Sequence, residues 1–439
     1  MSILASSWAW AANSVRGAWL RIAASTRWML GYEGVPPLAR PTFRQEFIAT
    51  IFAALGGGVL VQEFVQLFAT KLLSAPAWLI GVLAAEVSAG LLLGSFLSQY
   101  LRRRRMVRFT VVSRLIIAGA MLLVALLPAE PLCAYIYAIL LAVPAVLGAL
   151  VVNVNSGVWH ANYPHASRGR IYSRLMVAGT LAGIVSIRLA SAALDQWDWA
   201  HHLTYPAGAA CMIASAWAYS RIRVRGEGVM IRQVVAERPN IWAGFQILRQ
   251  DRAYGAYMFW QMVSGSSLLM TGPVLVLAVD EMFKVSFSAG TMLLVIVPAC
   301  MQVLTVPLAG WMFDRTNIMR YRTVNALLWA TGRFCVFAGL FARSLTLLTV
   351  GFAIQGLANA TGNVVWNIGH THFAPPEKSQ LYMGIHLTLT GIRGLTMPFI
   401  GIFLYAHTTL GIWVIALACV GQVAAAIGFA RSSPAMRRP

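Results

Sequence analysis

Ionisable side chains inside apolar stretches are the residues of this chain that could do chemistry. They are Glu63, Glu86, Arg188, Arg333 and Arg393. An ionised group is costly in hydrocarbon unless it is paired or solvated, so each one predicts a function and needs a partner. A carboxylate whose cationic partner arrives and leaves during a conformational cycle can take up and release a proton. The expected chemistry is therefore ion or proton binding.

A second polar set follows a helical period. It consists of Gln355, Asn359, Asn363 and Asn367, at four-residue intervals, which keeps the four amides within about a third of a helix circumference. An amide that faces lipid would lack hydrogen-bond partners, so the stripe is expected to face a watery cavity or another helix. Hydrogen bonding between helices alone is the alternative interpretation.

The composition excludes a soluble enzyme. Of 439 residues, 59% are hydrophobic and only 11% are charged, and the mean hydropathy is +0.68, as in a polytopic membrane protein. The net charge of +20 lies between the apolar blocks, so it fits an arginine-rich cytoplasmic face better than a nucleic-acid surface. The sequence has no P-loop pattern, and its 5 cysteines all fall in apolar segments. These features disfavour an ATP-driven pump and a thiolate metal cluster.

Apolar runs of about 20 residues, the length that crosses a bilayer, predict an all-α polytopic membrane protein with twelve transmembrane helices. The runs lie near 46–70, 76–101, 109–128, 131–157, 171–194, 201–221, 253–279, 286–312, 322–342, 345–368, 381–405 and 408–430. Alternate loops differ in arginine content, and the rich set includes Arg315, Arg320 and Arg322 before the ninth run. By the positive-inside rule, we expect both termini in the cytoplasm.

A polar stretch at 222–250 divides the runs into two halves of six, a 6+6 pattern. The expected organisation is a cytoplasmic amphipathic segment at 1–45, an N-terminal half at 46–221, a cytoplasmic linker at 222–250, a C-terminal half at 251–430 and a basic tail at 431–439. In the first segment, apolar residues recur at helical spacing with arginines between them, which predicts a helix in the membrane interface.

The two halves repeat weakly. Arg44-Gln45-Glu46 opens the first run, and Arg249-Gln250-Asp251 opens the seventh, 205 residues later. The fourth run is followed by Trp159, Tyr163 and Tyr172, and the tenth by Trp366, Phe373 and Tyr382. The shared order favours an internal duplication, as in many transporters.

Two loops resemble those of the major facilitator superfamily (MFS), in which a glycine precedes an acid and basic residues in the pattern G-x-x-x-D-R/K. The loop after the eighth run reads Gly310-Trp311-Met312-Phe313-Asp314-Arg315, and the loop after the second runs from Gly94 to Arg104. The resemblance covers about residues 44–430, but the first loop has Ser98 in place of the acid and Leu101 in place of a second glycine. It implies a gating role for Gly94, Arg102, Arg103, Gly310, Asp314 and Arg315, with the gating ion pair of the first loop missing. A merely solvated loop is the alternative.

The resemblance also implies which spans meet. The first, fourth, seventh and tenth would line a central cavity, the first would neighbour the fifth, and the second would meet the eleventh. We therefore expect Glu63 to face Arg188 and Glu86 to face Arg393, with static structural ion pairs as the alternative. Polar residues expected to converge on the cavity are Gln62, Gln66, Gln261, Ser264, Ser267, Gln355, Asn359 and Asn363. Arg333 falls on a peripheral span, where a structural role is expected.

The expected function is secondary active transport of a small solute by alternating access across the cytoplasmic (inner) membrane. Three arginines against two glutamates within the spans favour an anionic or zwitterionic cargo, and the carboxylates offer a route to proton coupling. The protein is expected to act as a monomer, without catalysis, a cofactor or nucleic acid. No metal site is expected either, because the close pair His370 and His372 has no third ligand at a usual spacing. A membrane sensor or scaffold that keeps the fold without transporting is the alternative.

Overall fold

The computed structural model describes residues 35–102, 104–228, 231, 241–375 and 379–432. The interfacial helix expected within 1–45 therefore lies mostly outside the described residues, as do the tail from 433 onwards and residues 229, 230 and 232–240 of the linker. The first transmembrane helix begins earlier than predicted, at Arg40. Pro41 lies in its first turn, where a missing N–H costs no helical hydrogen bond.

Each predicted crossing is helical, and the described part of the chain contains no strand. In the N-terminal half the helices are α2 (Arg40–Gly57) with η2 (Gly58–Leu60) and α3 (Gln62–Lys71), then α4 (Ala77–Arg102), α5 (Met106–Val124), α6 (Cys133–Asn162), α7 (His165–Gln196) and α8 (His201–Ser220). The C-terminal half has α11 (Arg252–Phe283), α12 (Phe287–Thr291) continued by a π-helical turn (Met292–Ile296) and α13 (Val297–Arg315), then α14 (Ile318–Phe341), α15 (Leu345–Ile368), α16 (Ser379–Ala406) and α17 (Trp413–Ser432).

Within the described residues, 11 helical segments are long and apolar enough to cross a membrane. The 20-residue helix α8 is not among them, but it packs against α2 and α5 as part of the same bundle. The short helix α10 (Ile241–Gln250) lies in the stretch predicted as a linker and packs against α11 and α16. The predicted all-α fold of two six-helix halves is confirmed.

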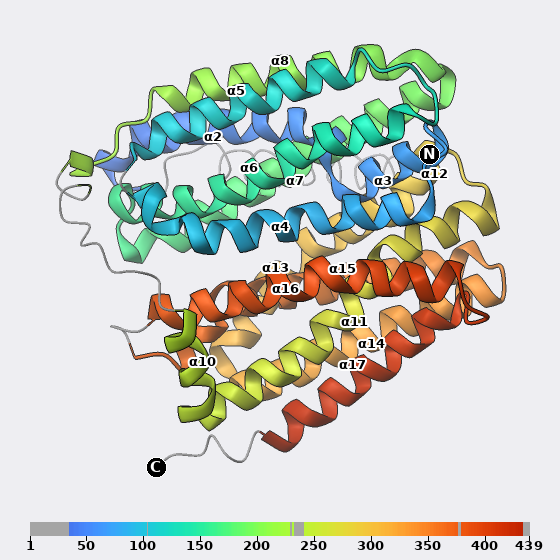
Figure 1. The fold of residues 1–439 in the computed structure, drawn as a ribbon. Coiled ribbons are helices and arrows are strands. Elements are labelled where there is room, and N and C mark those ends of the chain that lie inside the picture. The colour runs from blue at the N-terminus through green and yellow to red at the C-terminus, as the bar shows by residue number, and fades with distance from the viewer. Residues whose placement is uncertain (1–34, 103, 229–230, 232–240, 376–378, 433–439) are drawn as a thin grey trace, which may run out of the picture.

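The two halves use the same packing scheme. In the first half α2 packs against α7 and α8, α4 against α6, and α5 against α6 and α8. The corresponding pairs in the second half are α11 with α16 and α17, α13 with α15, and α14 with α15 and α17. Figure 1 shows the halves as two layers, with α2 to α8 in one and α11 to α17 in the other. The repeated packing supports the duplication inferred from the sequence.

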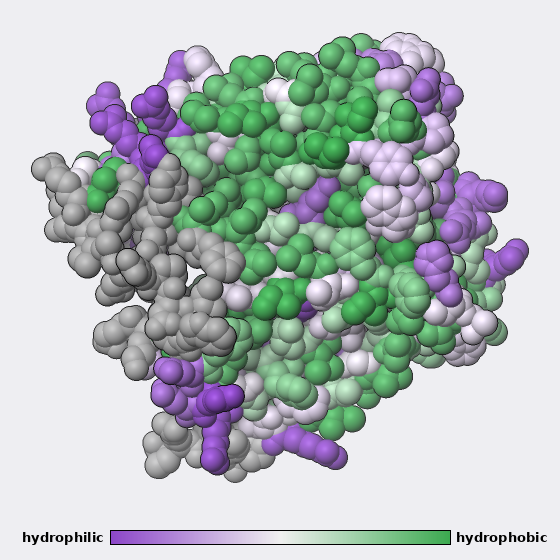
Figure 2. Space-filling view, viewed as in Figure 1, coloured by the Kyte–Doolittle hydropathy of each residue, from purple (hydrophilic) through white to green (hydrophobic). Residues whose placement is uncertain are grey.

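The outer surface of the bundle is apolar. Large side chains such as Leu126, Ile139, Leu189 and Leu304 are exposed, and Figure 2 shows a broad apolar band with hydrophilic residues at its two ends. A soluble protein would bury such a band, whereas a bilayer solvates it. The surface therefore fits a protein that spans a membrane.

Glycines break the first crossing at the place where α7 and α8 approach it. A Cβ at Gly56 would lie 2.6 Å from the carbonyl oxygen of Gly208, and one at Gly58 would lie 2.5 Å from Ser186 Oγ. Ser186 donates a hydrogen bond of 2.5 Å to the carbonyl of Leu55, in the last turn of α2 before the break. Because Val61 is extended, a new helix, α3, starts at Gln62.

Candidate functional site between the two halves

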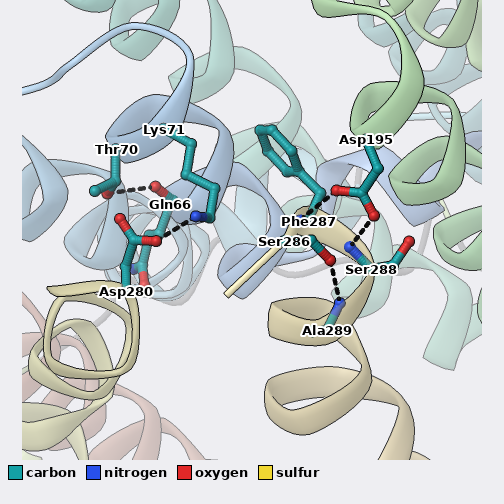
Figure 3. Close-up of polar contacts among 9 residues, drawn as sticks. All are labelled: Gln66, Thr70, Lys71, Asp195, Asp280, Ser286, Phe287, Ser288 and Ala289. Atoms are coloured by element: carbon teal, nitrogen blue, oxygen red, sulfur yellow. Dashed lines mark hydrogen bonds and ion pairs between the residues drawn. The ribbon is translucent and has the colours of Figure 1, made fainter. Parts of the chain in front are cut away.

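The two halves are joined by polar contacts at the end opposite the arginine-rich loops (Figure 3). Near the end of α7, the carboxylate of Asp195 accepts hydrogen bonds from the backbone N–H groups of Phe287, at 2.6 Å, and Ser288, at 3.0 Å. Lys71 of α3 forms an ion pair with Asp280 of α11. The Asp195 carboxylate thus binds the positive end of α12 and ties the halves together at this end of the bundle.

Helices α4 and α16 extend the contact between the halves toward the middle of the bundle. A Cβ at Gly81 would lie 3.0 Å from Ile402, and one at Gly391 would lie 2.8 Å from Leu92. Close to the centre, a Cβ at Gly394 would lie 1.9 Å from Ser88 Oγ. Small residues on α16 therefore let its backbone approach α4 closely.

The predicted pair of Glu63 with Arg188 is wrong, because Arg188 is exposed on the outer side of α7. Its neighbour Ile187 faces the bundle and is buried, and adjacent positions on a helix point about 100° apart. The first turn of α3 contains Glu63. The charge that acts on Glu63 is that of Arg333 on α14, in the other half.

The predicted pair of Glu86 with Arg393 is also wrong. Ser88 is one of the α4 residues that face α16, so Glu86, two positions earlier and about 200° around the helix, points away from α16. The Glu86 carboxylate is buried, with Oε1 lacking a hydrogen-bond partner among the described residues, and its charge acts on Tyr137 of α6. Arg393 instead donates hydrogen bonds to the backbone oxygen of Gln261, at 2.6 Å, and to Thr390 Oγ1, at 3.2 Å.

The amide stripe of α15 does not face a single environment. Gln355 is buried against α14, where a Cβ at Gly332 would lie 2.9 Å from Gln355 Cγ. Further along the helix Asn359 is half-buried and Asn363 is exposed, while the side chain of Asn367 lies outside the described ones. The buried end of the stripe therefore packs against another helix, as the alternative interpretation held.

Other polar residues expected at a cavity also pack within a half. Ser264 of α11 donates to Gln422 of α17 at 2.9 Å, and a Cβ at Gly421 would lie 2.1 Å from Ser267 Oγ. Gln62 donates to the backbone oxygen of Ala84 at 3.2 Å. Gln66 is buried, and its amide nitrogen has no hydrogen-bond partner in the part of the chain that the structure describes.

A group of basic side chains lies inside the C-terminal half. Arg322 is the fifth residue of α14, not a loop residue as predicted, and its side chain is only 4% exposed. It donates hydrogen bonds to Gln261 Oε1 and to Asn325 Oδ1, the latter at 2.9 Å. The charges of Arg322 and Arg393 act on each other and on the buried imidazole of His386. Gln261 thus bridges two buried guanidinium groups.

The N-terminal half contains a counterpart that the sequence analysis missed. Arg114 of α5 donates hydrogen bonds to Ser215 Oγ, at 2.8 Å, and to its backbone oxygen, at 3.2 Å. Its guanidinium lies 4.5 Å from the ring of Tyr219, as that of Arg322 lies 5.0 Å from the ring of Phe429. The arginines are 208 positions apart and the rings 210. The offset of the sequence repeat could have revealed this pair.

The two arginines Arg114 and Arg322 differ in their surroundings, because a buried carboxylate lies near Arg114. Glu46 of α2 is buried and accepts hydrogen bonds from Trp159 Nε1 and from the Tyr163 hydroxyl. Its charge acts on Arg114. The repeat-related acid, Asp251, instead accepts hydrogen bonds from the Tyr254 N–H and the Tyr382 hydroxyl, each at 3.0 Å.

The loop residues expected to act as gates are only partly described. Gly94 is buried, whereas Asp314 and Arg315 are exposed, with the Arg315 guanidinium 4.5 Å from the ring of Trp311. No atom lies within 4 Å of a Cβ placed on Gly310, so this glycine is not required for a close helix approach here. The Arg102 side chain and Arg103 lie outside what the structure describes, and the gating role stays a prediction.

The histidine pair lies next to α15, in the short segment Gly369–His372. Burial lowers the pKa of both His370 and His372 below the usual value of about 6.5, so both side chains are neutral at pH 7. Among the described residues, no three His, Cys, Asp or Glu side chains are grouped so that they could hold a metal ion.

No family model and no curated relative matches this chain. Solved structures do. It is similar to the nucleoside transporter NupG, with 14% identity, 89% of this chain and 98% of that chain covered, and a TM-score of 0.64. It is also similar to a partially occluded inward-open structure of the xylose transporter XylE from E. coli, with 12% identity, 90% of this chain and 98% of that chain covered, and a TM-score of 0.66. A third similar structure is a POT family transporter in complex with a thioalcohol-conjugated peptide, with 12% identity, 90% of this chain and 97% of that chain covered, and a TM-score of 0.71. At these identities the likeness is one of fold.

Proposed function

We propose that this chain, which has the fold of the major facilitator superfamily, is a secondary active transporter that moves a small solute by alternating access. The similar solved structures are nucleoside, xylose and peptide transporters. In this proposal the arginine-rich loops and both termini face the cytoplasm, by the positive-inside rule. The protein acts as a monomer in the inner membrane.

The observation that carries the proposal is the joining of two equivalent bundles at one end. Lys71, Asp195 and Asp280 make polar contacts there that water could replace if the halves separated. These contacts are outside the core of either half, so breaking them leaves each bundle intact. The structure then corresponds to a state closed on the outer side, and the opposite state requires the halves to rock apart at these residues.

Coupling to protons is proposed to involve Glu63. The residue lies in the first turn of α3, directly after the break in the first crossing, and the cation that acts on it belongs to the other half. Rocking of the halves would change the distance between Glu63 and Arg333. Because a nearby cation favours the ionised carboxylate, such a change would let Glu63 take up a proton in one state and release it in the other.

The first experiment identifies a substrate and tests coupling. Detergent-purified protein is screened for compounds that raise its melting temperature at two pH values, and a compound that does so is assayed in proteoliposomes with an imposed pH gradient. Glu63→Gln is expected to abolish uptake driven by the gradient, because the side chain can no longer change its protonation, while exchange of solute in the absence of a gradient continues.

The matched control is Glu130→Gln, which removes an exposed carboxylate in the loop between α5 and α6 and should leave uptake unchanged. Gradient-driven uptake by the Glu63→Gln variant at the wild-type rate would exclude Glu63 from coupling. A protein that binds compounds but transports none would favour the alternative function, a membrane sensor or scaffold, for which Ser98 in place of the loop acid is the supporting observation.

A further inference from the structure

The basic group of the C-terminal half lacks a compensating acid. The ionisable neighbours that act on Arg322 are Tyr257 and Tyr321, and those that act on Arg393 are Arg322 and Tyr257. Neither set includes a carboxylate of the described residues. Two guanidinium groups that are 4% and 5% exposed therefore repel each other inside the bundle.

Several polar side-chain atoms of this group also lack a hydrogen-bond partner. Nε of Arg322, Nε of Arg393 and Nε2 of His386 are buried without a hydrogen-bond partner among the described residues. Buried polar atoms are normally paired. Donors that remain unpaired on adjacent cationic side chains indicate that an acceptor from outside the chain completes the site.

The N-terminal half serves as an internal comparison. Its equivalent arginine, Arg114, lies near the Glu46 carboxylate, which Trp159 and Tyr163 hold in place. In the second half Asp251, which follows the same Arg-Gln pair in the sequence as Glu46 does, caps the start of α11 with local hydrogen bonds and does not act on Arg322. The two bundles share a packing scheme, but only the arginine of the N-terminal half has a carboxylate whose charge acts on it among the described residues.

We infer that Arg322 and Arg393 bind an oxyanion group of the transported solute, a carboxylate or a phosphoryl group, with Gln261 holding the two guanidinium groups apart. Guanidinium groups match the geometry of such oxyanions and bind them through paired hydrogen bonds. Arg393 lies near the middle of α16, and Gln261 lies on α11, whose other residues contact α3 and α4 of the first half. This inference rests on the proposed function, which it deepens by naming the substrate class.

The test measures binding by the full-length protein in detergent. Its melting temperature is recorded during titration with inorganic phosphate, with acetate and with chloride, all at constant ionic strength. A saturable rise is expected with phosphate or acetate and not with chloride, and the more effective probe identifies the phosphoryl or the carboxylate class. Arg393→Gln should weaken the apparent affinity by about tenfold or more, because it removes one cation of the pair.

Arg114→Gln is the matched control, because it removes the equivalent arginine of the half that has its own acid. It should lower the melting temperature without oxyanion, because it leaves Glu46 without its buried cation, but the apparent affinity for the oxyanion should be unchanged. A second variant, Gln261→Glu, guards against misfolding of the arginine variants. It places a carboxylate where Gln261 Oε1 already accepts from Arg322, so it should raise the melting temperature without oxyanion and remove the response to added oxyanion.

The inference is overturned if the wild-type melting temperature is the same in all three salts, if Arg114→Gln weakens the response as much as Arg393→Gln, or if Gln261→Glu keeps the oxyanion response. Binding is read here without transport. Oxyanion binding by a protein that moves no solute in proteoliposomes would therefore refute the proposed function and leave the anion site standing.

Discussion

Glu46 illustrates how a single side chain allows a cation to be buried. Its two carboxylate oxygens each accept a hydrogen bond, one from Trp159 and one from Tyr163. Hydrogen bonds donated to both oxygens favour the charged form of the carboxylate, which can then compensate the charge of Arg114. Removing one member of such a group leaves the other charge uncompensated in the bundle.

Glu46→Gln is therefore expected to lower the free energy of unfolding by about 3–5 kcal/mol, the usual cost of breaking a buried charge pair. The double variant Glu46→Gln with Arg114→Met should recover part of this loss, since it removes both charges. Unfolding in mixed micelles measures the free energies, and the coupling follows from a double-mutant cycle. Asp198→Asn, at an exposed residue of the short 3-10 helix Asp198–Ala200, is the control. Additive effects of the two substitutions would show that Glu46 and Arg114 do not interact.

At this scale the sequence identifies charges more readily than their partners. Glu63, Glu86, Arg333 and Arg393 are found by their apolar surroundings, but Glu63 is coupled to Arg333 and not to Arg188. Partners depend on the rotation of each helix about its axis, which a family resemblance does not specify. Arg322 was assigned to a loop because α14 begins earlier than its apolar run does, at Ile318, where Asn317 Oδ1 accepts a hydrogen bond from the Met319 N–H.

The position of Glu63 depends on the break between α2 and α3, which follows from the close packing of three glycines against neighbouring helices. Three consecutive glycines, Gly56, Gly57 and Gly58, bring the first crossing against α7 and α8. None of the three needs a positive φ, so their role here is close approach and not backbone freedom. The three positions differ in how much space they have, and this difference provides a direct test.

Gly56→Ala is expected to destabilise the protein by about 1–3 kcal/mol, the usual cost of overpacking, because its Cβ would lie 2.6 Å from the backbone oxygen of Gly208. Gly57→Ala should be tolerated, since the nearest atom to its Cβ would be Met212 Cε, at 3.7 Å. Melting temperatures of the two purified variants make the comparison. Equal destabilisation by both would contradict the proposed close approach of α2 and α8.

The sequence predicts that each transmembrane helix exists more readily than it predicts irregular turns within a helix. Apolar runs of about 20 residues locate the crossings, yet the run at 286–312 proved to be α12, a π-helical turn and α13. Pro298, the second residue after that turn, has no N–H to donate, which favours the altered hydrogen-bond pattern. Irregularities of this kind depend on which neighbouring side chain fills the widened turn, and the spacing of apolar residues in the sequence does not predict that side chain.

On the scale of the whole molecule, the duplication is visible both in the sequence and in the packing. Glu46 and Asp251 each follow an Arg-Gln pair, and each helix pair in one half has a counterpart in the other. The sequence does not predict at which end of the bundle the two halves meet. That depends on contacts such as those of Lys71 with Asp280 and of Asp195 with α12. Those residues stand far apart in the sequence and show no pattern that relates them.

If the halves must separate at these contacts, a covalent bond across them should stop transport. The hydroxyl oxygens of Ser191 on α7 and Thr291 on α12 are hydrogen-bonded at 2.9 Å. In a background without the native cysteines, Ser191→Cys with Thr291→Cys is expected to form a disulfide on oxidation and to lower the transport rate by about tenfold or more, because the outer end can no longer open. Reduction should restore the rate.

The control joins two helices of the same half, Thr110 of α5 and Asn155 of α6, whose side chains are hydrogen-bonded at 3.3 Å. Thr110→Cys with Asn155→Cys, oxidised in the same way, should leave transport largely intact, since alternating access moves the halves as bodies. Each single-cysteine variant should be insensitive to oxidation. Wild-type transport by fully cross-linked Ser191→Cys/Thr291→Cys protein would mean that α7 and α12 stay together throughout the cycle, and the rocking of two halves about a central site would have to be abandoned for this chain.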